Sequence, residues 1–175
     1  METKVWVSVG RCKVLVLLAM VCFWPLAAKA WEAEVVAVPD GDSLKVRSQG
    51  KEVKVRLYGI DCPEFGQDNW QDARRLTRSL AGGQRVSLET MDRDQYGRIV
   101  ALVHNGDVLI NRELVRQGLA WVYPRYCRTE PLCGEMKGLE VAARRQDLGL
   151  WEGRAPLPPW KWKRLNPKEN ERRWR

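Results

Sequence analysis

A chain of 175 residues is long enough for one compact domain with short appendages and too short for a second full domain. Its hydrophobic fraction of 45% can form a packed core, which excludes a wholly disordered chain. The net charge of +8 is uneven, because residues 154–175 hold eight Lys or Arg and two Glu, whereas residues 31–153 hold 18 basic and 19 acidic side chains. Attraction of an anionic partner by a uniformly basic surface is therefore excluded for the central part of the chain.

The first 30 residues have the three-part layout of a secretory signal peptide. Positive charges precede an apolar run over residues 14–28, at Lys4, Arg11 and Lys13, and an A-K-A sequence ending at Ala30 fits a cleavage site. The run is shorter than the roughly 20 residues that a spanning helix needs, although an uncleaved membrane anchor is the alternative. We expect cleavage after Ala30 and export to the periplasm or the exterior.

Periodicity predicts strands and then helices between residues 31 and 153. Alternating polar and apolar residues predict three strands with short connections, which favours an antiparallel meander, at residues 31–38, 43–48 and 52–60. Helical spacing follows at residues 67–81, then two strands at 84–91 and 98–103, and two helices at about 109–117 and 134–148. This order predicts an α+β fold, a five-stranded OB-type β-barrel with about three helices, as the domain over residues 31–153.

Residues 154–175 differ in composition, with Pro, Trp and basic residues and no core-forming periodicity. We expect them to form an extended tail outside the barrel domain. Basic residues interleaved with Trp160, Trp162 and Trp174 are compatible with weak contact to a nucleic-acid backbone or to an anionic membrane surface. A solvated terminus that makes neither contact is the third interpretation.

The number and positions of the cysteines and the histidine limit the kinds of site that the chain can form. Two of the five cysteines fall in the signal segment, and Cys62 is interpreted as a small apolar filler. Cys127 and Cys133 are close enough in sequence for a small-loop disulfide in an oxidising compartment. Because His104 is the single histidine, a zinc site, a nuclease with paired histidines and a Ser-His-Asp hydrolase are poor interpretations.

Three segments at the ends of predicted strands carry residues suited to phosphodiester cleavage: 40–43 (D-G-D-S), 56–64 (R-L-Y-G-I-D-C-P-E) and 94–98 (D-Q-Y-G-R). A hard divalent cation needs oxygen ligands, which Asp42 and Asp61 can supply. The planar forks of Arg56 and Arg98 can bind the oxygens of a phosphate, and Glu64 can orient or deprotonate a water. Taken singly, each Asp is also typical of turns and each Arg of a solvated ion pair.

These three motifs, together with N-R-E-L-V-R-Q-G-L-A in residues 111–120, resemble those of the staphylococcal nuclease family in order and spacing. The resemblance runs from about Trp31 to Trp151. It implies an enzyme that cuts DNA and/or RNA with calcium and leaves 3′-phosphate and 5′-hydroxyl ends. Nucleic acid would be its substrate, and a monomer without a stable protein partner is expected.

The same resemblance implies a role for individual residues. Two carboxylates and one backbone carbonyl would bind calcium: Asp42, Asp61 and Cys62. Two side chains on the scissile phosphate, and a general base or water-orienting carboxylate, would act in catalysis: Arg56, Arg98 and Glu64. Asp40 matches an acidic position that acts near the metal through water, and Tyr96 matches a position that contacts the terminal phosphate.

Two residues depart from the type member of that family. Cys62 replaces a Thr, but only its backbone carbonyl is asked to bind calcium. Gln95 replaces a Lys, which removes a cation beside Tyr96. A non-catalytic nucleic-acid-binding OB module is the alternative function, because barrels of this kind also serve as adaptors. Inert relatives would be expected to lack some of the metal or phosphate residues, and this chain has all of them.

Overall fold

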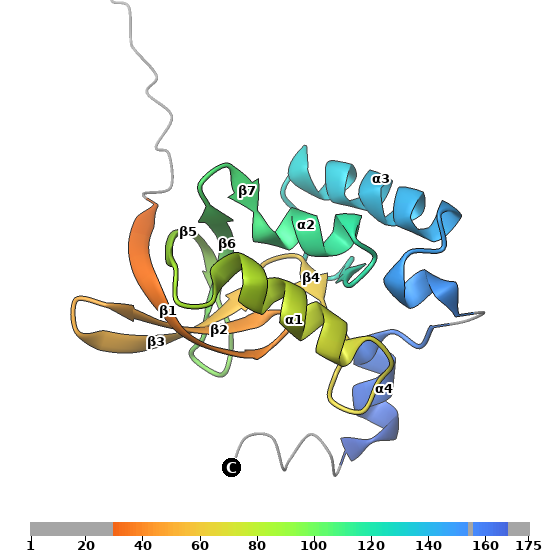
Figure 1. Cartoon of the computed structure of the whole chain (residues 1–175), viewed down its shortest axis with the longest axis horizontal. Helices are drawn as coiled ribbons and strands as arrows, with labels where there is room; N and C mark the ends of the chain where they lie inside the picture. The colour runs from red at the N-terminus through yellow and green to blue at the C-terminus, as the bar shows by residue number, and fades with distance from the viewer. Residues whose placement is uncertain (1–29, 154–155, 168–175) are drawn as a thin grey trace, which may run out of the picture.

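The computed structural model describes residues 30–153 and 156–167. The predicted signal peptide up to residue 29 and the last eight residues of the predicted tail, 168–175, lie outside the described residues. Within the described part, five strands form a barrel (Figure 1): β1 (Trp31–Asp40), β2 (Ser43–Ser48), β3 (Lys51–Leu57), β5 (Arg85–Arg93) and β6 (Ile99–Asn105). The predicted α+β fold with a five-stranded OB-type barrel is confirmed.

Antiparallel pairing gives the sheet order β3-β2-β1-β5-β6, which the short β7 (Val108–Leu109) extends. A parallel pairing of β3 with β6 closes the barrel, with Val55 opposite Ile99 and Leu57 opposite Ala101. Since side chains alternate between the two faces of a strand, one set fills the interior: Val35, Leu44, Val46, Val55, Leu57, Val86, Leu88 and Val103. The closure brings the strand with Arg56 beside the strand that begins after Arg98.

The predicted third strand over residues 52–60 is wrong at its end. β3 stops at Leu57, and a separate strand β4 (Ile60–Asp61) pairs with β8 (Trp121–Val122). Gly59 lies between them with φ of +75°, a conformation that favours glycine, and a Cβ there would lie 2.8 Å from Cys127 Sγ. The turn at Gly59 therefore redirects the chain and places Asp61 in a second, small sheet.

Within the described residues, four α-helices and one 3₁₀-helix surround the barrel: α1 (Trp70–Ala81), α2 (Ile110–Arg116), α3 (Leu132–Arg145), η1 (Gly149–Glu152) and α4 (Pro159–Leu165). α1 crosses the barrel, while α2 and α3 pack together beside it (Figure 1). The first three helices agree with the predicted ones within a few residues. The fourth corrects the prediction, because residues 159–165 form a helix and not an extended tail. Across residues 30–153 and 156–167, every helix is too short or too polar to cross a membrane.

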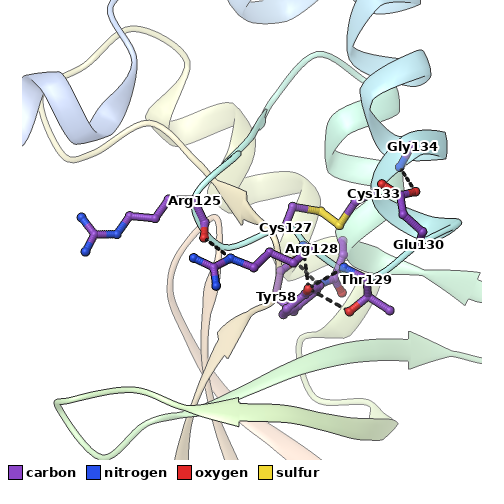
Figure 2. The surroundings of a disulfide bond; sticks show 9 residues. Tyr58, Arg125, Cys127, Arg128, Thr129, Glu130, Cys133 and Gly134 are labelled. Carbon is purple, nitrogen blue, oxygen red and sulfur yellow. Dashed lines mark hydrogen bonds between the residues drawn. A yellow bond between two sulfur atoms is a disulfide. The ribbon is translucent and has the colours of Figure 1, made fainter.

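A disulfide fastens the connection between β8 and α3 to the start of α3, and a tyrosine fastens it to the barrel (Figure 2). Cys127 and Cys133, whose Cα atoms lie 5.6 Å apart, form the disulfide. The hydroxyl of Tyr58 accepts the backbone N–H groups of Arg128 at 3.0 Å and of Thr129 at 3.1 Å. Because Tyr58 directly follows β3, these contacts support the short segment between β3 and β4.

Asn111, the first residue of the N-R-E-L-V-R-Q-G-L-A motif, also supports the short segment between β3 and β4. Its side chain is fully buried, and Nδ2 donates to the carbonyl oxygens of Tyr58 at 3.0 Å and Ala101 at 3.2 Å. Its Oδ1 accepts the backbone N–H of Val103 at 3.0 Å. This residue therefore ties α2 to the point where β6 closes the barrel, which is a structural role.

Candidate functional site

The tight turn between β1 and β2 holds Asp42 at one end of the barrel. Asp40 Oδ1 accepts the backbone N–H of Asp42 at 3.2 Å, a local hydrogen bond that Asp commonly makes in turns. Gly41 leaves no room for a side chain, because a Cβ there would lie 2.8 Å from the Cβ of Ala73 and 2.9 Å from the Cβ of Cys62. The turn is thereby enclosed between α1 and the segment that follows β4.

Arg56 bridges the two carboxylates predicted to bind a metal. It lies on β3, where Val55 and Leu57 point into the barrel, so its own side chain leaves the opposite face. The guanidinium donates to Asp42 Oδ1 at 2.5 Å and also to Asp61 Oδ1. Burial lowers the pKa of Arg56, but Asp42 and Asp61 outweigh burial and leave the pKa above its ordinary value. The guanidinium is therefore charged.

Asp61 has an oxygen that the described residues leave unsatisfied. Asp42 and Asp61 are 2% and 0% exposed, respectively. Asp42 uses both oxygens, because Oδ2 accepts the backbone N–H of Cys62 at 2.7 Å. Asp61 Oδ2, by contrast, is buried without a hydrogen-bond partner among the described residues. Leaving such an oxygen unpaired is costly, and a hard cation that prefers oxygen ligands would satisfy it.

The residues around Asp61 fit a calcium ion by the chemistry of their donors. No group of three His, Cys, Asp or Glu residues within 30–153 and 156–167 is arranged to hold a metal ion. The predicted set differs from such a group, because it consists of two carboxylates and the backbone carbonyl of Cys62. The thiol of Cys62 is buried, and burial raises its pKa well above the ordinary value. A protonated thiol is a poor nucleophile and metal ligand, which leaves the carbonyl as the donor.

Glu64 lies in the loop that connects β4 to α1. Its backbone N–H donates to Gln67 Oε1 at 2.8 Å, and the backbone N–H of Gln67 donates to the carbonyl of Glu64 at 2.9 Å. Pro63 fixes its own φ and stiffens the entry to this loop. The carboxyl of Glu64 is buried, and burial raises its pKa, although Lys163 opposes the shift. A carboxylate with a raised pKa is well suited to accept a proton from water.

Lys163 of α4, which is not among the predicted site residues, completes the cluster. Its Nζ lies 2.8 Å from Glu64 Oε1 and 3.2 Å from Asp61 Oδ1. Burial lowers the pKa of Lys163, but the two carboxylates outweigh burial and raise the pKa above its ordinary value. No signal in the sequence separates Lys163 from the other basic residues near the C-terminus, since its position depends on how α4 packs.

Arg98 and Tyr96 belong to a second group of contacts, at the turn between β5 and β6. Arg98 Nε donates to Asp94 Oδ2 at 2.6 Å, and its guanidinium lies 5.7 Å from the centre of the Tyr96 ring. Tyr96 is 72% exposed. Arg56 lies opposite Val100 in the parallel pairing, so the alternation of side chains places Arg98 on the same face of the barrel wall as Arg56. The register brings the two arginines to one face, and Arg98 also contacts Asp94 and Tyr96.

A groove with a volume of about 520 Å³ lies elsewhere, between β1 and α1. It is lined by residues 35–39 together with Arg74, Arg78, Gly82 and Gly83. None of the predicted site residues lines it. The candidate site is therefore the cluster of charged residues at the end of the barrel, and not this groove.

Comparisons with known proteins agree with the family resemblance that the motifs indicated. A family model described as staphylococcal nuclease homologue matches residues 54–153. An uncharacterized endonuclease of Escherichia coli is 37% identical over 152 residues, which cover 86% of this chain and 97% of the relative. A micrococcal nuclease of Shigella flexneri is 35% identical over 153 residues, covering 81% and 87%. An uncharacterized endonuclease of Haemophilus influenzae is 33% identical over 156 residues, covering 87% and 85%.

Proposed function

Because the chain belongs to the staphylococcal nuclease family, we propose that it is a calcium-dependent nuclease that hydrolyses DNA and/or RNA to 3′-phosphate and 5′-hydroxyl ends. One observation carries the proposal: the buried carboxylates of Asp42 and Asp61 share the guanidinium of Arg56, and Glu64 is linked to Asp61 through a common contact with Lys163. This cluster combines oxygen ligands, a phosphate-binding cation and a carboxylate of raised pKa.

The two carboxylates and the backbone carbonyl of Cys62 would hold the calcium ion. When bound, the ion supplies positive charge against the charge that develops on the phosphate oxygens. Asp40 supports the position of Asp42, because its side chain accepts the backbone N–H of Asp42 and so fixes the turn. Groups that orient ligands in this way contribute to metal affinity without touching the ion.

Hydrolysis needs one proton acceptor and two cationic donors from this chain. Glu64 accepts a proton from water while the water oxygen bonds to phosphorus and the bond from phosphorus to the 5′ oxygen breaks. The released 5′ oxygen takes a proton from solvent water and becomes the 5′-hydroxyl. Arg56 and Arg98 donate to the phosphate oxygens as their charge increases. For Arg98 this requires a phosphate to share the guanidinium with Asp94, whose present contact uses Nε. Tyr96 is exposed beside Arg98 and contacts the terminal phosphate.

Export to the periplasm or the exterior forms part of the proposal. The first 30 residues have the layout of a cleaved signal peptide, and the disulfide between Cys127 and Cys133 suits an oxidising compartment. The mature protein would be a monomer that begins at Trp31. The mass of protein recovered from the periplasm and medium tests this, and a chain that retains residues 1–30 in the membrane fraction contradicts it.

Cleavage of single-stranded DNA and of RNA tests the catalytic proposal. We expect activity with Ca²⁺, loss of activity with a chelator, and products whose 5′ ends accept a phosphate from polynucleotide kinase without prior dephosphorylation. Glu64→Gln should lower the rate by about 10²- to 10⁴-fold. Glu135→Gln, which removes an exposed carboxylate from a surface ion pair, is the matched control and should cleave at the wild-type rate.

Two results decide against this mechanism. Activity that a chelator leaves undiminished would exclude calcium as the required ion. Wild-type activity in Glu64→Gln would exclude Glu64 as the base. Binding of single-stranded nucleic acid without cleavage in the presence of Ca²⁺ favours the non-catalytic OB module instead.

A further inference from the structure

α4 is fastened beside the candidate site by contacts from separate parts of the chain. The helix lies next to the loop that leads into α1 (Figure 1). Gln67, which also holds the backbone of Glu64, donates through Nε2 to the carbonyl of Leu157 at 2.8 Å. Trp160 stacks on Tyr123, with ring centres 4.6 Å apart and planes inclined by 10°. The position of α4 therefore depends on both a polar and an aromatic contact.

Lys163 is the residue that α4 presents to the site. It lies three residues after Trp160, so the two side chains leave neighbouring positions on one side of the helix. Its ammonium contacts Asp61, a proposed calcium ligand, and Glu64, the proposed base. Its side chain is 32% exposed, so the ammonium can leave without the barrel opening. Lys161, on the same helix, is exposed, which makes it a matched comparison.

We propose that Lys163 is an intramolecular competitor for the divalent cation. In the absence of the ion its ammonium binds Asp61 Oδ1 and Glu64, and an ion bound at Asp61 Oδ2 would bring a further positive charge to the same carboxylate. Arg56 also contacts Asp61 Oδ1, and cations gathered at one buried carboxylate repel each other. The side chain of Lys163 is 32% exposed and that of Arg56 is 15% exposed, so Lys163 is the one that would leave. The inference rests on the proposed function, since it takes the calcium ion and its ligand Asp61 from there.

Tethering makes this competition independent of protein concentration. A side chain held by a docked helix acts at a fixed effective concentration, and the affinity of a ligand falls by the fraction of protein in the competent state. Lys163 therefore lowers the apparent calcium affinity as long as α4 stays docked. The match to the family model ends at residue 153, so α4 lies beyond the matched domain and adds this control to it.

Calcium titration of the full chain by isothermal calorimetry, without nucleic acid, tests the proposal. We expect Lys163→Met to bind Ca²⁺ at least about tenfold more tightly than the wild type, a difference of about 1.4 kcal/mol. Lys161→Met removes the same charge from the same helix and should bind like the wild type. Lys163→Arg retains a cation of similar reach and should also stay near the wild-type affinity.

Trp160→Ala tests the tether separately, because it removes the stacking on Tyr123 and keeps Lys163. It should also tighten Ca²⁺ binding, and hydrogen exchange in the wild type should show faster exchange of amides in residues 160–166 after Ca²⁺ is added. This variant also covers the case in which Lys163→Met fails to fold.

The outcomes separate the two proposals. Equal or weaker Ca²⁺ binding by Lys163→Met, or slower exchange of α4 on adding Ca²⁺, overturns the competitor and leaves the proposed metal intact. If neither the wild type nor any variant binds Ca²⁺, the proposed metal fails and the competitor fails with it. Tighter binding by Lys161→Met to the same extent as by Lys163→Met shows an effect of net charge and likewise overturns the inference.

Discussion

The β1–β2 turn and the β5–β6 turn both carry residues of the proposed site, but only the first is enclosed by the fold. A Cβ on Gly41 would meet α1 and Cys62 within 3 Å, whereas a Cβ on Gly97 would meet nothing within 4 Å. Asp42 is 2% exposed and Tyr96 is 72% exposed. The β5–β6 turn is held instead by its own Asp94, which accepts backbone N–H groups from Tyr96 and Arg98.

This difference fits separate roles for the two turns in the proposed mechanism, metal binding in the first and contact with the nucleic-acid strand in the second. Metal ligands must be held in a fixed geometry, and packing on several sides supplies that rigidity at Asp42. A nucleic-acid strand must enter and leave, which an exposed turn with its own internal hydrogen bonds allows. Substitutions in the first turn should therefore affect stability and activity together, and substitutions of the exposed side chains in the second should affect activity much more than stability.

Arg56→Ala should have the largest effect. It leaves Asp42 and Asp61 buried without their shared partner, so the free energy of unfolding should fall by about 3 kcal/mol or more, and activity should be lost. Urea denaturation measures the first effect. The matched control is Arg47→Ala on β2, whose ion pair with Glu52 is half exposed and should contribute less than about 1 kcal/mol. Equal losses in the two variants would break the comparison.

Arg98→Ala should separate activity from stability. Removing one cationic donor from the phosphate should lower the cleavage rate by about 10²- to 10³-fold. The fold should persist, because the pair with Asp94 lies within a single turn, and circular dichroism and the melting temperature check this. Arg93→Ala, which removes a donor to the Gly97 carbonyl in the same turn, is the control for a general loosening. An unfolded Arg98→Ala would assign this residue a structural role.

Gly41→Ala and Gly97→Ala compare the two turns directly. The first pushes a methyl group against Ala73 and Cys62 and should cost about 1–3 kcal/mol through overpacking. The second has open space but a φ of +77°, so it should cost about 1 kcal/mol through backbone strain. Thermal unfolding gives both values, and a larger loss in Gly97→Ala would contradict the contrast between an enclosed and an open turn.

Tyr96→Phe should have the smallest effect. The ring stays beside Arg98, and Tyr96 as a whole is 72% exposed, so the melting temperature should change little when the hydroxyl is removed. We expect KM to rise by about tenfold or less, as for one lost hydrogen bond, and only for oligonucleotides with a terminal phosphate. The same oligonucleotides without that phosphate provide the control, and an equal rise for both would remove the proposed contact.

Local sequence patterns were sufficient to predict much of the barrel. Alternation in residues 43–48 matches β2 residue for residue, because one face of that strand is buried and the other exposed. The break at Gly59 was missed, since the alternation continues across it, and the reasons for a glycine there, its φ of +75° and the closeness of Cys127, are seen only in the structure. The parallel pairing of β3 with β6 also has no local signal, because it joins segments separated by one helix and two strands.

The candidate site likewise has residues that the sequence predicted and one that it did not. Asp42, Arg56 and Asp61 were predicted together, and they do meet, because each stands at a strand end that the barrel brings to one place. Lys163 was missed for a physical reason: a seven-residue helix held by Trp160 and by Gln67, 90 residues upstream of Leu157, has no apolar periodicity to reveal it. Composition alone described that segment as a basic tail.

The parallel pairing of β3 with β6 also bears on when the protein can act. Arg56 and Arg98 reach one face only after β3 and β6 have paired. The pairing of these two strands is the one that closes the barrel. Non-local pairings of this kind form late, because a long loop must close before they contribute any stability. A chain that is still being synthesised therefore has the residues of the proposed site but not their arrangement, and we expect it to leave nucleic acid uncut until folding is complete.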